Sequence, residues 1–307
     1  MRSTVALSLL LVTTGFFIHV MNCGELHAAG GPIVWPTYQE VEVEAGEYVS
    51  EYVYIENQGD HPVLVSLYVA DFTVRADGTF VFTEPGHGTY SASTWIALDM
   101  SETRVGPGER VEIPVHIAVP EDAGPGGHYA AVFVEMPSGP AESGVSISTR
   151  IPSLFYITVD SERGVIATAE IHRLVYPAIA TGKPVETGVV LRNTGNVHLT
   201  IAARAYFKDM WGVGSELDLG QMVLLPGGEG TLRAFWDDSP FMGSVEVSVV
   251  AGYFDAEGNL IQKPAGATFW IVPWRELTGF VVAFPLLIAV GWVIRKKFSF
   301  RSPIKRK

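Results

Sequence analysis

Two stretches of the chain share one pattern: residues 54–68, YIENQGDHPVLVSLY, and residues 190–201, VLRNTGNVHLTI. In each stretch an apolar run leads into an Asn-x-Gly triplet, and an alternating apolar run follows it. Because Asn and Gly accept the backbone conformations of tight turns, each stretch predicts a strand, a hairpin turn and a second strand. The repeat therefore predicts two copies of one β module.

The chain between residues 31 and 273 extends this pattern outward from the two turns. A Gly-Glu pair precedes a strand at matching points, in VGPGE at 105–109 and in LPGGE at 225–229. Alternating apolar and polar residues, broken by turn signals about every eight to twelve residues, are typical of β-sandwiches. The predicted strands are 41–44, 50–56, 63–68, 79–82, 96–100, 110–118, 129–135, 146–158, 165–174, 186–192, 198–207, 221–225, 230–236, 244–253 and 266–271.

The predicted fold class is all-β, with two tandem immunoglobulin-like β-sandwich domains and one C-terminal transmembrane helix. The first domain covers residues 31–160 and the second covers 164–273. The boundary between them is placed at SERG, residues 161–164, where the apolar pattern is interrupted.

The distribution of charge excludes one class of partner. All 33 acidic residues lie between Glu25 and Glu276, whereas seven of the 21 basic residues lie in the last 13 positions. The region between the two ends is therefore strongly acidic. Such a surface repels nucleic acid, so no nucleic-acid partner is expected. Surface acidity is otherwise consistent with nothing more than solubility.

The N-terminus has the build of a secretory signal peptide. Arg2 precedes an apolar run from Val5 to Val20, and the small-residue stretch HAAG follows at residues 27–30. We predict a signal peptide over residues 1–29, cleaved near Ala28 or Ala29. The single cysteine, Cys23, leaves with that peptide, although the preceding VMN also resembles a weak lipoprotein box.

The C-terminus predicts a membrane anchor. Residues 277–294, LTGFVVAFPLLIAVGWVI, carry no charge and are long enough to cross the hydrocarbon core as a helix. The basic tail at 295–307 predicts a cytoplasmic C-terminus, which places the rest of the chain outside the cell. No LPxTG-type pentapeptide precedes the helix, so the helix is expected to stay in the membrane. The predicted localisation is a single-pass protein of the cell membrane with an extracellular N-terminal ectodomain.

The order of motifs resembles bacterial immunoglobulin-like cell-surface modules, of which the DUF916 group, also called WxL-interacting proteins, is the nearest in plan. The resemblance rests on the Asn-x-Gly turn, the Pro-Gly-Glu segment, the segment PGGHYAAVF at 125–133 and the stretch DFTVRADG at 71–78. It covers most of residues 35–160, and beyond that only the architecture. It implies a first domain that engages peptidoglycan and a second that engages another surface. A weaker resemblance is to periplasmic pilus chaperones, which also pair two immunoglobulin-like domains.

The sequence contains no nucleophile elbow, zinc-ligand spacing, phosphate-binding glycine loop or EF-hand loop, so we predict neither an enzyme nor a bound metal or cofactor. Four residues are candidates for binding. Trp211 lies between predicted strands. A solvent-facing indole at this position would suit sugar stacking or a protein contact, and the alternative is that Trp211 packs in the core. His128 is either a surface residue or a glycan or metal contact. Asp237 and Asp238 either form a turn or offer carboxylates to calcium.

These features predict a non-enzymatic, membrane-anchored adhesion or scaffold protein. Its candidate partners are the membrane, through the C-terminal helix, and peptidoglycan or another surface protein. The alternative is a chaperone-like assembly protein that binds secreted surface subunits by edge-strand pairing. A hydrolase of wall material, which would use surface carboxylates, is a third hypothesis.

Overall fold

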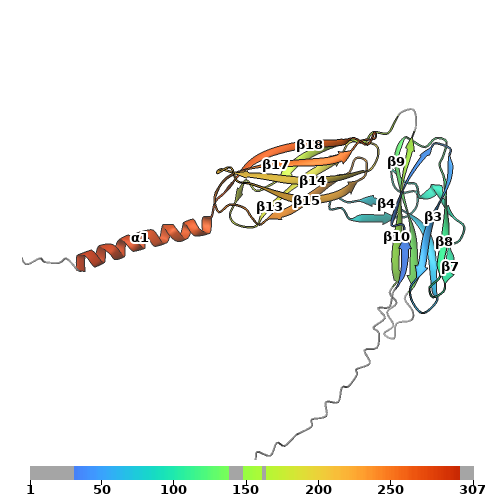
Figure 1. Cartoon of the computed structure of the whole chain (residues 1–307), viewed down its shortest axis with the longest axis horizontal. Helices are drawn as coiled ribbons and strands as arrows, with labels where there is room; N and C mark the ends of the chain where they lie inside the picture. The colour runs from blue at the N-terminus through green and yellow to red at the C-terminus, as the bar shows by residue number, and fades with distance from the viewer. Residues whose placement is uncertain (1–30, 138–147, 161–163, 298–307) are drawn as a thin grey trace, which may run out of the picture.

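The computed structural model describes residues 31–137, 148–160 and 164–297, and they form an almost entirely β structure followed by one long helix (Figure 1). The predicted signal peptide, Cys23 and most of the predicted basic tail lie outside the described residues. The strands are β1 (Pro32–Trp35), β2 (Tyr38–Glu44), β3 (Tyr48–Asn57), β4 (Val63–Val74), β5 (Phe80–Thr83), β6 (Ile96–Leu98), β7 (Glu102–Val105), β8 (Arg110–Ala118), β9 (Gly126–Pro137), β10 (Ser148–Asp160), β11 (Ala169–Val175), β12 (Ile179–Ala180), β13 (Val185–Asn193), β14 (Leu199–Asp209), β15 (Gly214–Leu224), β16 (Glu229–Trp236), β17 (Gly243–Phe254) and β18 (Leu260–Ile271). A single 3-10 turn covers Ser93–Trp95, and α1 covers Trp274–Lys297.

The strands β1 to β10, here called the first half, form two sheets around one core. Sheet 1 has the order β1-β3-β8-β6, and sheet 2 has the order β2-β10-β9-β4-β5 with β7 also paired to β4. Side chains that alternate along each strand meet between the sheets, as expected for a sandwich. The core contains Val53, Ile55, Val65, Ile113, Val115, Ile117, Val132, Val134, Phe155 and Ile157 among others.

The strands β11 to β18, the second half, repeat this arrangement. Sheet 3 has the order β11-β13-β16 and sheet 4 has the order β12-β18-β17-β14-β15. The first strand of each half belongs to one sheet, and the next short strand crosses to the other sheet and pairs in parallel, β2 with β10 and β12 with β18. The two halves therefore share this crossover and most of their strand order, although β6 of sheet 1 has no counterpart in sheet 3. The assignment of residues 31–160 and 164–273 to two immunoglobulin-like domains stays a prediction.

The structure corrects the predicted hairpins at the two Asn-x-Gly turns. β3 lies in sheet 1 and β4 in sheet 2, and likewise β13 and β14 lie in different sheets. Each turn is therefore an arch between sheets. Neither Gly59 nor Gly195 has a positive φ. Asn is present at these positions for its side chain and not for a turn conformation. Asn57 and Asn193 are fully buried, and their side chains donate hydrogen bonds to the backbone of neighbouring segments.

The strand predictions agree with the observed strands for every predicted segment, although the bounds differ. The largest extensions are in β4, β15 and β18. Strands β1, β7 and β12 were not predicted; each has four residues or fewer, which gives little alternation to detect, although β5 and β6 are as short and were predicted. Trp270 is exposed, because it lies on the outward phase of β18 between the buried Phe269 and Ile271.

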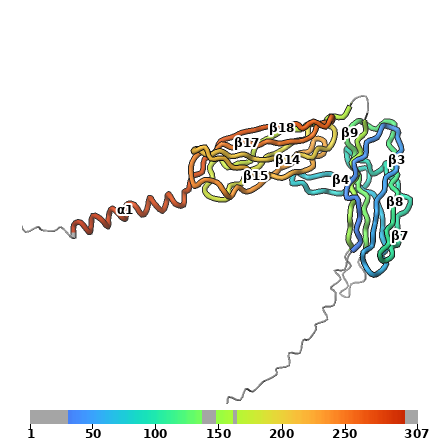
Figure 2. Tube along the Cα trace, in the orientation of Figure 1, coloured from blue at the N-terminus to red at the C-terminus, as the bar shows by residue number. Residues whose placement is uncertain are grey.

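The two halves meet at a bend, with the hairpin β4–β5 reaching from the first half toward the second (Figure 2). Backbone hydrogen bonds cross this junction from Gly127 N to Asn196 O at 2.7 Å and from Thr231 N to Ala76 O at 2.9 Å. Leu225 packs into a cluster of apolar side chains that otherwise belongs to sheet 2. The junction is therefore a packed contact between the halves.

α1 extends away from the second half and has none of its apolar window buried in the described part of the chain. Its 24 residues contain the predicted span 277–294, with Pro285 inside. By length and composition it can cross a membrane. The helix starts close to the sheet, because Val272 N bonds to Ala180 O of β12 at 2.8 Å.

Candidate protein-binding site

The outer face of sheet 2 is apolar, which is unusual for the solvent side of an antiparallel sheet. Along β9, Ala130, Val132 and Val134 belong to the core of the first half. The alternate residues Tyr129, Ala131 and Phe133 point to the other face and are also buried. The same holds for the neighbouring strands, whose outward cluster members are Ala70, Phe72 and Tyr156.

Part of this outer face is covered by the second half. His198 lies against the Tyr156 ring, with ring centroids 4.5 Å apart, and Leu225 joins the same cluster. Burial lowers the pKa of His198, and the nearby Glu40 carboxylate, 3.8 Å from Nε2, opposes that shift. Burial likewise raises the pKa of Tyr156 to about 12. Burial between the two halves thus favours the uncharged form of both groups.

Farther along the sheet the outer face is open and forms a groove of about 670 Å³. Its floor is made by Tyr68, Phe133 and Arg150, which come from β4, β9 and β10. One wall is made by Phe82 and the residues that follow it, as far as His87. The groove has the size of a typical ligand-binding pocket and is lined mainly by apolar and aromatic groups.

Stacked aromatic rings fix the shape of the groove. Tyr68 stacks on Phe133 with centroids 5.1 Å apart, and Phe82 meets Phe133 edge-on at 4.7 Å. The Arg150 guanidinium lies 3.3 Å from the Glu135 carboxylate, so its charge is partly neutralised. Burial raises the pKa of Tyr68, while the charge of Arg150 opposes this.

The wall is held in place by the buried carboxylate of Asp71. It accepts hydrogen bonds from His87 N at 3.0 Å, from Ser91 Oγ at 2.7 Å and from Ser93 N at 3.3 Å. Burial alone would raise the pKa of Asp71, but the hydrogen bonds from Ser93, Ser91 and Gly88 outweigh it and hold the pKa below the usual 3.8. Asp71 is thus a charged anchor for the segment 85–93.

The groove borders a stretch of β10 that has a partner on one side only. Residues 154–159 pair with both β2 and β9, whereas residues 148–153 pair with β9 and with no other described strand. At the inner end of this stretch, the buried Ser153 Oγ donates a hydrogen bond to Pro36 O at 2.7 Å. Leu154 N donates to Thr37 O toward the β2 side. Because backbone direction alternates along a strand, the N–H groups of Ser148 and Arg150 point to that same open side.

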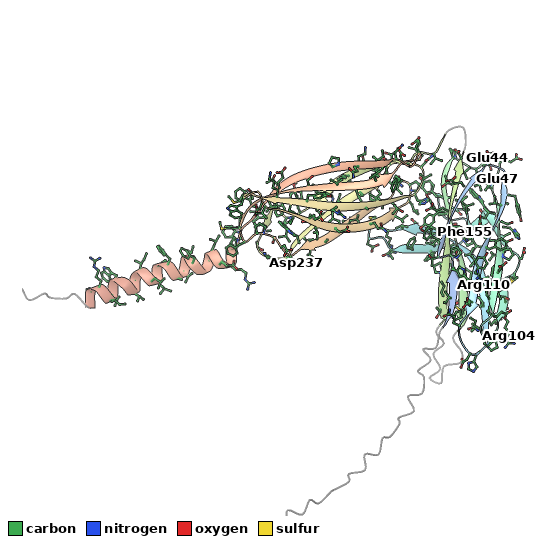
Figure 3. All side chains as sticks on the ribbon, viewed as in Figure 1. Glu44, Glu47, Arg104, Arg110, Phe155 and Asp237 are labelled. Atoms are coloured by element: carbon green, nitrogen blue, oxygen red, sulfur yellow. The ribbon has the colours of Figure 1, made fainter. Side chains whose placement is uncertain are left out.

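The residues predicted from the sequence lie elsewhere. Trp211 lies in the turn between β14 and β15 and is exposed, so the core-packing alternative is wrong. Asp237 and Asp238 follow β16, and Asp237 lies near the start of α1 in Figure 3. In the part of the chain that the structure describes, no three His, Cys, Asp or Glu side chains are grouped to hold a metal ion.

His128 is also placed differently from the surface position expected for it. It lies on β9 in the phase that faces the core of the first half, against the Trp95 ring at 4.4 Å. Its Nε2 lies 2.9 Å from Gly124 O, and burial lowers the pKa of His128. His128 therefore contributes to packing, on the opposite face of sheet 2 from the groove.

The groove residues were not predicted because they form no polar motif in the sequence. The available signal was YAAVFVE at 129–135, which is apolar on both phases of a strand. Such a strand needs cover on both faces. A strand of this kind at a sandwich surface indicates a second packing partner.

Comparisons with known proteins give no family. No protein-family model matches the chain, and no curated protein matches it. Among solved structures, it is similar to the CsuC–CsuE chaperone–tip adhesion subunit pre-assembly complex of Acinetobacter baumannii, with a TM-score of 0.40 and 13% identity over 76% of this chain and 98% of that chain. It is also similar to the Salmonella enterica SafA pilin in complex with the SafB chaperone (TM-score 0.40, 12% identity, 77% of this chain and 95% of that chain). A third is the E. coli chaperone DraB (TM-score 0.39, 11% identity, 76% and 97%). These similarities are weak and assign no function to this chain.

Proposed function

We propose that the chain is a non-enzymatic, membrane-anchored protein that binds an extended apolar segment of a secreted polypeptide and assists its assembly at the cell surface. One observation carries the proposal: an open stretch of β10 borders an apolar aromatic groove on the outer face of sheet 2. Arg150 belongs to both features, since its side chain lines the groove and its backbone lies in the open stretch. This favours edge-strand pairing over the adhesion hypothesis.

The backbone of the partner would pair with residues 148–153. A strand added there would continue the line of β2 along β10, where Ser148 and Arg150 present N–H groups. Pro152 lacks an N–H, so pairing is strongest toward Ser148. Main-chain bonds of this kind supply affinity for an extended segment with little dependence on its sequence.

The side chains of the partner would supply selectivity. On a strand added beside β10, every second residue points to the outer face. A side chain opposite Arg150 would lie about 5 Å from it, at the mouth of the groove. A long apolar or aromatic side chain could then reach Tyr68 and Phe82, whose exposed parts would be removed from water.

The proposed location follows from the two ends of the chain. The predicted signal peptide and the basic residues that follow the apolar span support an ectodomain outside the cell. α1 supports anchoring in a membrane. A partner captured here would be held at the membrane as it emerges, before it folds or assembles.

Photo-crosslinking in cells tests the proposal at the groove. A crosslinking amino acid in place of Phe82, which is partly exposed, should capture a secreted polypeptide. The same amino acid in place of Tyr48, which is exposed on β3 of sheet 1, is the matched control and should not. Crosslinks to wall glycan instead of protein, or equal capture from both positions, would contradict the proposal and favour adhesion.

A backbone variant tests the edge separately. Ser148→Pro removes one N–H from the open side and should reduce capture about fivefold, because one net hydrogen bond is worth about 1 kcal/mol. Ser148→Ala keeps the N–H and should leave capture unchanged. If both variants behave alike, edge pairing is not the mode of binding.

A further inference from the structure

A second apolar surface lies at the opposite end of the second half, beside the start of α1. Two loops form this surface, here called the anchor-side tip: the turn at residues 209–213 between β14 and β15, and the loop at 237–242 between β16 and β17. Met210, Trp211, Val213, Phe241 and Met242 on these loops are each between 50 and 66% exposed. Large apolar side chains gathered on exposed tips indicate a contact surface.

Strand pairing places both loops at the level where α1 begins. Gly243, at the end of the second loop, pairs with Ile271, the last residue of β18. Asp209, at the start of the first loop, pairs with Val245 of the same strand, β17. Only Val272 and Pro273 separate β18 from α1.

The two loops also lie against each other. A side chain added at Gly243 would meet Met210 Sδ at 2.6 Å and the Trp211 ring at 3.6 Å. The anchor-side tip is therefore one continuous patch, and Trp274 at the start of α1 is exposed at the same end. Figure 3 shows Asp237, the first residue of the second loop, close to the start of the helix.

The first loop is built to present its side chains in a fixed way. The Asp209 carboxylate accepts hydrogen bonds from Trp211 N at 2.9 Å and Val213 N at 2.8 Å. Gly212 has a φ of +83°, which completes the tight turn. The Asp209 carboxylate is thus occupied by hydrogen bonds within the turn, and the apolar side chains are exposed on the outside of this turn.

We propose that the anchor-side tip docks on the lipid surface of the bilayer that α1 enters, with Trp211, Phe241 and Met242 in the boundary between headgroups and acyl chains. The occupant is lipid because the patch is continuous with a membrane span that starts two residues beyond β18. Trp and other large apolar side chains favour this boundary. The proposal rests on the proposed anchoring by α1 and fixes the orientation of the ectodomain on the membrane.

Spin labels on the full chain test the docking. With Cys23 replaced by Ser, single cysteines are introduced by Trp211→Cys and Met242→Cys, and the protein is reconstituted in vesicles of phosphatidylcholine and phosphatidylglycerol. The accessibility of each label to oxygen, which enters lipid, is compared with its accessibility to a water-soluble nickel complex. Ile288→Cys in α1 is the lipid control, and the exposed Ala256→Cys, in the turn between β17 and β18 at the other end of the second half, is the water control.

The labels at Trp211→Cys and Met242→Cys should rank with Ile288→Cys, with the ratio of oxygen to nickel accessibility raised above that of Ala256→Cys. If they rank with Ala256→Cys while Ile288→Cys lies in lipid, the docking proposal is wrong and the anchoring stands. If Ile288→Cys is also in water, anchoring and docking both fail. Labels shielded from both reagents would show that protein covers the tip, which also overturns the proposal.

Discussion

Asn57 and Asn193 hold equivalent positions in the two halves and make equivalent hydrogen bonds. Asn57 Nδ2 donates to His61 O and Val105 O, and its Oδ1 accepts from Gly59 N. Asn193 Nδ2 donates to Val197 O and Leu224 O, and its Oδ1 accepts from Gly195 N. Each Asn therefore satisfies three backbone groups at a buried position where the chain crosses between sheets.

Asn57→Ala should lower the free energy of unfolding by about 3 kcal/mol, because unsatisfied buried polar groups cost about 1–3 kcal/mol each and the site collapses only partly. Asn193→Ala should do the same. Denaturant unfolding of the full chain in detergent measures both. Gln58→Ala, at the exposed neighbour, is the control and should change stability by less than about 0.5 kcal/mol. Equal effects of Gln58→Ala and Asn57→Ala would contradict this role.

Asp71 is the second residue on which local structure depends, and it carries a charge. Asp71→Asn should lower the free energy of unfolding by about 2 kcal/mol, because an amide cannot accept all the hydrogen bonds that the carboxylate receives. The pKa of Asp71 is lower in the folded chain than its ordinary 3.8, so its contribution is present above that pH and is lost as the pH falls below it. Unfolding curves from pH 5 downward should show this loss in the native chain.

The variant Asp71→Asn should lack that acid-dependent part, while Glu84→Gln, at an exposed wall residue, should retain it. An identical pH dependence in the native chain and in Asp71→Asn would refute the assignment.

The repeat could be located from the sequence, but the burial and hydrogen bonds of its Asn residues could not be predicted. An Asn-x-Gly triplet predicts a turn from local preference alone. Whether the Asn is exposed or buried depends on the segment at 105–109, nearly 50 residues away, whose carbonyl it binds. The role of Asp71 could not be predicted for the same reason, since its partners at 87–93 follow only from the fold.

β9 is the element that connects the core of the first half to the candidate site. Its two phases are both buried, one in the core and one under the second half and the groove. Strand bounds and alternation were predictable because they depend on neighbours in the sequence. The burial of the outer face of β9 was not predictable, because it depends on how the second half packs against sheet 2.

The junction between the halves should be sensitive to acid through His198. Burial holds its folded pKa below the ordinary 6.5, so the unfolded chain binds more protons in the interval between the two values. Stability is therefore full above about pH 6.5 and falls as the pH drops through that interval. His198→Phe keeps a ring against Tyr156 and should weaken this dependence.

Denaturant unfolding at about pH 7.5 and about pH 5 measures the effect. The native chain should lose more stability on acidification than His198→Phe does. The loss of stability that remains in His198→Phe includes a contribution from His128, whose pKa is also lowered by burial. His172, with an exposed side chain on β11, provides the control variant His172→Phe, which should behave as the native chain. Equal losses in the native chain and in His198→Phe would refute the role of His198.

At the scale of the whole molecule, the second half separates the groove from α1. α1 leaves one end of the second half, and the first half is joined to the other end at the bend (Figure 1). The groove is therefore held away from α1 by the packed sheets of the second half. The order of sandwich-like sheets followed by one apolar helix was predictable from the sequence pattern, whereas the bend was not, because it depends on contacts such as Gly127 with Asn196.

Amide hydrogen exchange at Arg150 tests the central claim most directly. The segment of the secreted polypeptide captured through Phe82 would be added as a synthetic peptide to the full chain. Exchange of the Ser148 and Arg150 amides should then slow, because their N–H groups gain acceptors in the added strand, while amides of β15 stay unchanged. Peptide binding with no change in exchange at Ser148 and Arg150 would contradict edge pairing at β10.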